Sequence, residues 1–253
     1  MSAMKESDKH IAALIDLHRS LDRQGPGDAA FSKHILSLLP ELPQKPRIAD
    51  LGSGTGAGTF VLIEWFKAKV CAVDFSQAFL DELEAHAEAR GLRDRVQTVQ
   101  GDMGSLNWPP ASIDLLWSEG AAYNLTFFGA LRAWRPLLAS NGLAVISEIS
   151  WFSKDIPEPV WNYWTNAYPA ISTEAENSEK AVAAGFRVLA IHRLPASAWW
   201  ENYYNPLKEK IAFIKADADE AMGSVIQEVE AEMDIFRHYS DTYGYSFYVL
   251  QAA

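Results

Sequence analysis

The sequence predicts an α/β fold in which a seven-stranded sheet carries helices on both faces. Three observations indicate this fold: apolar strand patterns alternate with helical patterns, a glycine-dense turn follows the first strand, and polar residues stand where successive strands end. Alternating strands and helices are typical of a doubly wound, largely parallel sheet. A chain of 253 residues, 49% of them hydrophobic, can bury the core of such a domain.

The elements follow from periodicity in chain order. Ile48 and Ala49 belong to the first strand, which runs into the glycine turn. After it the patterns predict helix 57–67, strand 69–74, helix 77–91, strand 96–100, strand 113–117, helix 126–138, strand 143–149, helix 173–184, strand 187–194 and strand 245–251. Asn141 and Gly142 suit a left-handed cap at the end of helix 126–138.

The turn after the first strand has the composition of a ligand-binding loop. Gly52, Gly54 and Gly56 lack a Cβ, so the backbone can adopt positive φ and lie against a ligand, while the next helix offers its free N–H groups. Gly52, Gly54 and Ala57 also satisfy the Gly-x-Gly-x-x-Gly/Ala pattern of dinucleotide-binding folds. The turn alone therefore indicates a nucleotide-like cofactor and leaves its identity open.

Acidic or polar residues end each of the next strands. Asp74 ends the second strand, at the distance from the turn expected of a carboxylate that receives both hydroxyls of a ribose. Asp74 also suits an N-terminal cap for the helix that starts near Ser76. Asp102 follows the third strand, and Ser118 and Glu119 follow the fourth. Because the carboxyl ends of parallel strands share one edge, we expect these residues to converge on one crevice.

The order of these motifs resembles the class I S-adenosylmethionine-dependent methyltransferases. In that family the glycine turn holds the methionine part of the cofactor, the acid of the second strand holds the ribose, and the Asp after the third strand reads the adenine. The resemblance implies S-adenosylmethionine as cofactor, S-adenosylhomocysteine as product and no metal. It implies these cofactor-binding residues: Gln24, Gly25, Asp50, Gly52, Ser53, Gly54, Gly56, Asp74, Phe75, Asp102, Met103, Ser118 and Glu119.

The resemblance also refines the fold and the subgroup. It implies a Rossmann-like sheet whose last strand, 245–251, runs antiparallel between the fifth and sixth. The segments 23–27, 117–124, 150–152 and 241–248 are similar to a bacterial small-molecule subgroup, the methyltransferase type 11 or ubiquinone/menaquinone-biosynthesis type. The Asn/Asp-Pro-Pro-Tyr/Phe sequence of enzymes acting on amide or base nitrogens is missing after the fourth strand, which argues against those acceptors.

Three stretches exceed what the sheet needs. We expect residues 1–43 to form a helical lid on a methyltransferase domain of residues 44–253, with substrate-covering insertions at about 151–169 and 196–242. The insertions are rich in aromatic residues, which suit a flat or prenylated substrate or, through cation–π attraction, an amine. The substrate-binding residues expected here are Tyr123, Asn124, Trp151, Tyr168, Trp200, Tyr203 and Tyr243.

Methyl transfer makes few demands on catalytic side chains. An amine or thiolate acceptor needs no strong base, whereas a hydroxyl acceptor does. Glu119 and Tyr123 are the leading catalytic candidates because they follow the fourth strand. His192 and His238 are further candidates, since histidine titrates near neutral pH.

Composition narrows the partners. The net charge of −11 disfavours binding to a nucleic-acid backbone, so we expect a small-molecule substrate. Cys71 is the single cysteine, which excludes an internal disulfide and suits a reducing cytoplasmic setting. We expect neither a signal peptide nor a membrane span. A homodimer is compatible with the sequence.

These observations favour a cytoplasmic methyltransferase that acts on a small-molecule amine, thiol or hydroxyl. Two alternatives follow from the same residues. The glycine turn also predicts an NAD(P)-dependent oxidoreductase, and the acidic helical pattern at 222–239 would suit a non-catalytic protein that keeps the fold for interaction. The presence of both strand-end acids, Asp74 and Asp102, favours the methyltransferase.

Overall fold

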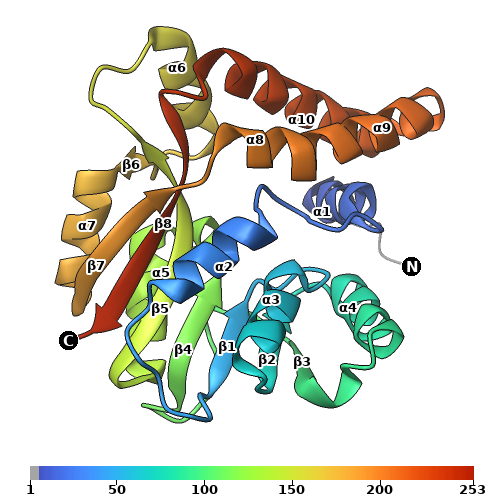
Figure 1. Cartoon of the computed structure of the whole chain (residues 1–253). Helices are drawn as coiled ribbons and strands as arrows, with labels where there is room; N and C mark the ends of the chain where they lie inside the picture. Colours follow the sequence, from blue (N-terminus) through green and yellow to red (C-terminus); the bar gives the residue numbers. More distant parts are fainter. Residues whose placement is uncertain (1–5) are drawn as a thin grey trace.

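The computed structural model describes residues 6–253 and shows one twisted sheet with helices on both faces (Figure 1). The strand order is β3-β2-β1-β4-β5-β8-β7, with the short β6 paired to β5. The strands are β1 (Ile48–Leu51), β2 (Val70–Asp74), β3 (Val96–Gln100), β4 (Ile113–Ser118), β5 (Leu138–Trp151), β6 (Ser172–Thr173), β7 (Phe186–Arg193) and β8 (Tyr243–Ala252). The α/β class predicted from sequence is confirmed.

The last strand is antiparallel, as the family resemblance implied. β8 pairs antiparallel with β5 and with β7, whereas β1 to β5 are mutually parallel where they pair. Tyr248 of β8 lies opposite Ile146 of β5 and Ile191 of β7. The chain between β7 and β8 therefore leaves and re-enters the sheet at the same carboxyl edge.

Side-chain alternation along the strands separates two cores. Leu115 and Val145 face the first core with α3 (Ala57–Phe66), whereas Leu116 and Ile146 face the second. The helices on the sheet are α2 (Ala29–Ser37), α3, α4 (Gln77–Ala89), α5 (Phe127–Trp134) and α7 (Glu174–Ala183), with short 3₁₀ turns η1 (Arg93–Arg95), η2 (Ala122–Leu125) and η3 (Arg135–Leu137). Burial on both faces explains the near-continuous apolar strands.

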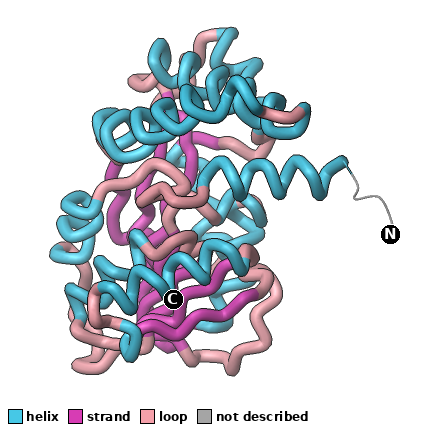
Figure 2. The backbone as a smooth tube through the Cα atoms, turned by 90° about the vertical axis from the view of Figure 1, so that its right-hand side faces the viewer, coloured by secondary structure: helices cyan, strands magenta, loops and turns pink. Residues whose placement is uncertain are grey.

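The remaining helices form a layer above the carboxyl edge of the sheet, which Figure 2 shows above the strands. We call it the helical layer. It comprises α1 (Glu6–His18), α6 (Glu158–Ala167), α8 (Ala196–Trp199), the π-helical turn η4 (Trp200–Tyr204), α9 (Asn205–Ile214), η5 (Lys215–Asp217) and α10 (Glu220–Tyr239). α1 packs against α9 and α10, so the start of the chain contacts its last insertion. No helix within residues 6–253 has both the length and the apolar composition that crossing a bilayer demands.

Two details of the predicted elements were wrong. Helix 126–138 ends earlier, at Trp134, because Pro136 lacks an N–H and the chain tightens into the 3₁₀ turn η3. Asn141 and Gly142 do not cap it; they lie within β5, where Asn141 has φ of 60° and the pairing with β4 shifts register. An irregularity inside a strand and a helix cap both favour a left-handed residue, so the two patterns look alike.

Candidate active site

The glycine turn adopts the conformation that its composition predicts. Gly52, Gly54 and Gly56 have φ of 75°, 52° and 98°, in the left-handed region that favours glycine. A Cβ on Gly52 would lie 2.2 Å from the Cβ of Ala121, and one on Gly54 would lie 2.4 Å from Oε1 of Gln24. The turn is thus packed closely between β4's loop and the segment that precedes α2.

Asp74 ties the glycine turn to the end of β2. Its Oδ2 accepts a hydrogen bond from the Gly54 N–H at 2.9 Å, and its Oδ1 accepts one from the Ser76 N–H at 2.9 Å. Burial nevertheless raises the pKa of Asp74, because desolvation of the charge outweighs these backbone donors. Ser76, and not Asp74, caps α4 through its side chain. Asp74 is left facing the cavity beside the turn.

Asp50 is the most deeply buried acid of the site. Only 2% of it is exposed, and its Oδ2 accepts a hydrogen bond from the Thr59 hydroxyl at 2.6 Å. Burial raises the pKa of Asp50 to about 7, the Thr59 bond lowers it in part, and the neighbouring charge of Glu119 raises it further. A proton on this carboxyl therefore exchanges near neutral pH.

Glu119, at the end of β4, holds three parts of the chain together. Its Oε1 accepts hydrogen bonds from the Trp117 indole and the Ser32 hydroxyl, each at 2.8 Å. Its Oε2 pairs with Nη1 of Arg23 at 2.9 Å, and both side chains are about nine-tenths buried. The Glu119 carboxylate thus accepts hydrogen bonds from three side chains, which suits a positioning role.

The chain between α1 and α2, residues 19–28, crosses over the glycine turn, and we call it the strap. Gln24 Oε1 accepts hydrogen bonds from the Thr55 N–H at 2.9 Å and the Thr55 hydroxyl at 3.1 Å. On the other side Asn202 of η4 donates to the Gly27 carbonyl at 3.0 Å. The strap is therefore bonded both to the sheet domain and to the helical layer.

These groups line one cavity of about 680 Å³ at the carboxyl edge of the sheet. This volume lies within the range of small-molecule and cofactor sites, roughly 300–1,000 Å³. The residues predicted from sequence that line it are Gln24, Gly25, Asp50, Gly52, Ser53, Gly54, Asp74, Phe75, Asp102, Met103, Glu119, Tyr123 and Asn124. Four strand ends thus meet at one crevice in the structure.

Two predicted cofactor residues lie outside the lining. Gly56 caps the N-terminus of α3 through its backbone, and a Cβ there would meet Leu83 and Phe60. Ser118 is fully buried and donates to the Leu51 carbonyl at 2.8 Å, which ties β4 to β1. Both residues therefore stabilise the chain around the glycine turn: Gly56 at the start of α3 and Ser118 between β4 and β1.

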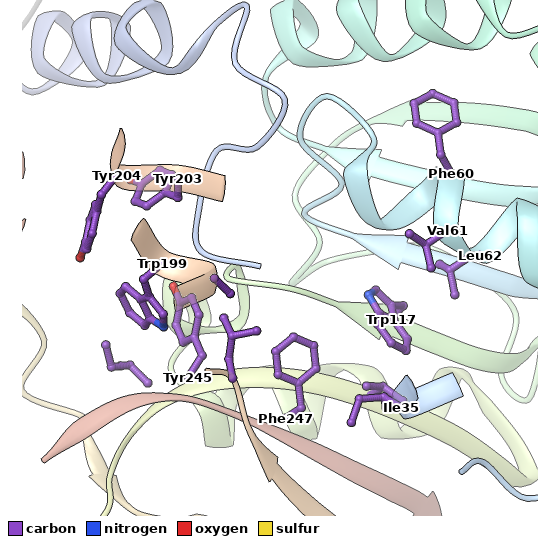
Figure 3. Packing of buried hydrophobic residues seen from close by; sticks show 14 of the residues in the cluster. Ile35, Phe60, Val61, Leu62, Trp117, Trp199, Tyr203, Tyr204, Tyr245 and Phe247 are labelled. Carbon is purple, nitrogen blue, oxygen red and sulfur yellow. The ribbon is translucent and has the colours of Figure 1, made fainter. Parts of the chain in front are cut away.

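Five residues predicted to bind the substrate pack against other aromatic rings and are absent from the cavity lining: Trp151, Tyr168, Trp200, Tyr203 and Tyr243. Tyr243 and Tyr203 are buried, and Trp199 stacks on Phe236 at 4.2 Å (Figure 3 shows Trp199 beside Tyr245). Aromatic side chains bury the largest areas, so here they form the core of the helical layer.

The sequence predicted a helical lid over residues 1–43 but named no residue of α1 as a site residue. Ile11, Leu14, Ile15 and His18 line the cavity from above. The apolar spacing of α1 predicts a packed helix face, and nothing in the sequence shows that part of this face borders a cavity. Arg23 was also missed as a site residue, although it stands next to Gln24.

Tyr123 stands at the opening between the sheet and the helical layer. It is 43% exposed and lines the cavity, and its ring packs edge-on against the ring of Tyr168, with 6.1 Å between the ring centroids. Desolvation raises its pKa, so its hydroxyl stays protonated and acts as a hydrogen-bond donor. Behind it, Tyr168 donates to the buried Glu148 at 2.8 Å, and burial raises the pKa of Glu148 to about 8.

Comparison with known proteins agrees with this geometry. Residues 48–142 match the model of a methyltransferase domain. The chain is 25% identical over 132 residues to a sterol 24-C-methyltransferase of Gibberella zeae, covering 51% of this chain and 34% of that protein. It is 28% identical over 124 residues to a geranyl diphosphate 2-C-methyltransferase of Saccharopolyspora erythraea, covering 49% and 42%. The aligned parts span less than half the length of these relatives.

A solved structure extends the likeness to the whole chain. A SAM-dependent methyltransferase from Geobacter sulfurreducens, in complex with S-adenosyl-L-homocysteine, superposes with a TM-score of 0.77 at 20% identity and covers 100% of both chains. Residues 48–142 therefore form a methyltransferase domain within a fold of this kind. At 20% identity the solved structure shows a shared fold alone, and the match to a methyltransferase domain covers residues 48–142.

Proposed function

We propose that this protein transfers the methyl group of S-adenosylmethionine to a small-molecule acceptor and releases S-adenosylhomocysteine. The observation that carries the proposal is the cavity in which the glycine turn, Asp74 and Asp102 come together. A dinucleotide oxidoreductase is disfavoured by the antiparallel β8 between β5 and β7 and by the match to a methyltransferase domain. S-adenosylhomocysteine in a structure of the same fold supports the same cofactor.

The residues of the turn fit the methionine part of this cofactor. The Ser53 hydroxyl is buried, lines the cavity and has no hydrogen-bond partner among the described residues. An unpaired buried hydroxyl costs free energy that a polar ligand would offset. The positive φ angles at Gly52 and Gly54 bring the bare backbone to the cavity wall. We assign Ser53, Gly52, Gly54 and Asp50 to the amino-acid end of the cofactor.

The nucleoside part fits the other strand ends. Each oxygen of Asp74 accepts one backbone hydrogen bond, and a carboxylate oxygen has a second lone pair, so Asp74 has capacity for the ribose hydroxyls. Phe75 and Met103 offer apolar surfaces to the same cavity, which Asp102 also lines. We assign these three residues to the adenine.

The cofactor, when bound, supplies an activated methyl group on a sulfonium. The protein then has to align an acceptor with it and keep water away. Arg23, Gln24 and Gly25 of the strap line the cavity and close it on one side. We assign Glu119 to holding Arg23 and the strap in place, and Tyr123 to orienting the acceptor through its hydroxyl.

Several finer features belong to the same proposal. We infer an acceptor small enough for the cavity, in line with the organic acceptors named for both sequence relatives. We also propose membership of the methyltransferase type 11 or ubiquinone/menaquinone-biosynthesis subgroup, a lid of residues 1–43 on a domain of residues 44–253, and a cytoplasmic location. The structure describes the segment proposed as the lid from residue 6 onward.

Calorimetric titration of the purified protein with S-adenosylhomocysteine, beside NAD and NADP, tests the cofactor without a known acceptor. We expect micromolar binding of S-adenosylhomocysteine alone. Binding of a nicotinamide cofactor in its place would contradict the proposal. A second step screens amines, thiols and phenols for formation of S-adenosylhomocysteine from S-adenosylmethionine. Cofactor binding with no turnover on any acceptor would favour the non-catalytic alternative.

A further inference from the structure

Large apolar side chains that would ordinarily be buried are left exposed around the cavity. Ile11 is 46% exposed and Leu14 is 38% exposed, and both line the cavity together with Tyr123 at 43%. Ile15 and Leu125 complete the same wall. Scattered exposed apolar residues need no explanation, whereas a group that converges on one cavity indicates a ligand surface.

The spacing along α1 shows that three residues of this wall lie on one face of the helix. Residues 11, 14 and 15 are three and four positions apart, so their side chains share a face. Leu17 is fully buried, and α1 packs against α9 and α10. The helix is therefore held by one side, and its Ile11, Leu14 and Ile15 side is free to contact a ligand.

Two polar side chains of this part of the cavity, His18 and Asn124, are hydrogen-bonded within the protein. His18 Nδ1 lies 2.8 Å from the Leu14 carbonyl and Nε2 lies 3.0 Å from the Tyr203 hydroxyl, and burial lowers its pKa, so the ring is neutral. The geometry assigns the proton to Nδ1, which donates to Leu14, while Tyr203 donates to Nε2. The Asn124 amide donates to the Ala121 carbonyl at 3.0 Å.

We infer that the methyl acceptor has an apolar, chain-like body, alkyl or isoprenoid, that lies along Ile11, Leu14 and Ile15. This inference rests on the proposed function, because it assigns the polar part of the cavity to the cofactor. A compact polar metabolite would leave the apolar wall in contact with water. A chain-like apolar body would cover the wall, and each buried CH₂ would raise affinity by about fourfold.

A homologous series of probes tests this inference. The protein is saturated with S-adenosylhomocysteine and titrated by calorimetry with butylamine, hexylamine, octylamine and decylamine, and then with the matching alkanols. We expect the affinity in at least one series to rise by roughly fifteenfold for each two added CH₂ groups until the wall is covered. The alkanol series separates the contribution of the chain from that of a charged head group.

Paired variants locate the effect. Leu14→Asn places an amide on the wall and should reduce the gain per CH₂ to about twofold or less. Val182→Asn is the matched control, because Val182 is exposed on α7 and does not line the cavity. The control should bind every probe as the unmodified protein does. An unchanged gain per CH₂ in Leu14→Asn would show that the chains bind elsewhere and would overturn the inference, as would equal losses in both variants.

The titrations also separate this inference from the proposed function. Failure of S-adenosylhomocysteine to bind would remove the proposed function, and the inference with it. Binding of S-adenosylhomocysteine together with no dependence on chain length in either series would overturn the inference alone. Displacement of S-adenosylhomocysteine by the longer probes would also overturn it, because the chains would then occupy the polar part of the cavity.

Discussion

The glycine turn and the helical layer border the same cavity but are specified in different ways. In the turn, backbone conformation determines which residues fit: three glycines have positive φ, and Gly52 leaves no space for a Cβ beside Ala121. In the helical layer, the apolar area of the side chains determines how the helices pack: Trp199, Phe236 and their neighbours pack ring against ring. The comparison teaches that a ligand site built from backbone constraints tolerates little substitution, whereas a packed layer depends on total apolar volume.

The largest expected effect is on the helical layer. Trp199→Ala removes a fully buried ring stacked on Phe236 and should lower the free energy of unfolding by about 3–5 kcal/mol, measured by urea denaturation. Trp161→Ala, at a ring that is 47% exposed, should cost about 1 kcal/mol or less. Similar losses in both variants would mean that the layer is not organised around Trp199.

The next effect concerns the turn region and pH. The pKa of Asp50 is raised from 3.8 to about 7, so the folded state holds this proton more tightly than the unfolded state, and stability falls as pH rises from about 4 to about 7. Asp50→Asn lacks this loss. Between pH 5 and pH 8 the unmodified protein, free of cofactor, should lose about 2–3 kcal/mol more than the variant. Parallel stability curves for the two proteins would show that Asp50 ionises without penalty.

A single methyl group tests the backbone constraint. Gly52→Ala should weaken S-adenosylhomocysteine binding by more than about tenfold, because the new Cβ must displace Ala121 and strain φ at 75°. Gly101→Ala is the control: Gly101 also lines the cavity, and a Cβ there meets nothing within 4 Å. The control should bind within about twofold of the unmodified protein. Normal binding by Gly52→Ala would show that the turn adapts.

The smallest effect isolates one side chain of the site. Asp74→Ala should weaken S-adenosylhomocysteine binding by about tenfold, through loss of the proposed ribose contacts and of the bond to Gly54. Asp102→Ala, measured beside it, tests the adenine assignment in the same titration. A change of less than about twofold for Asp74→Ala would remove this residue from the cofactor site.

The sheet domain was largely predictable because its signals are local. Each glycine of the turn and each strand-end acid stands next to the strand that positions it, so Asp74 and Asp102 could be assigned from sequence order. The wall of the cavity was less predictable because it depends on how α1 packs, 30 or more residues before β1. Tyr203 and Trp200 illustrate the limit of sequence-based assignment, because aromatic residues suit a ligand site and a core equally well. In the structure Tyr203 and Trp200 pack in the core.

For the proposed methyl transfer, the position of the strap has a consequence for the rate of turnover. Arg23 bonds to Glu119, Gln24 bonds to Thr55, and Asn202 bonds to Gly27, so hydrogen bonds hold the strap over the cavity at these three positions. Cofactor and product are therefore expected to exchange only when several of these bonds break together. Loops that close active sites move in microseconds to milliseconds, and their opening often limits kcat. Removing one of these hydrogen bonds would then speed product release and, at the same time, admit water to the reacting methyl group.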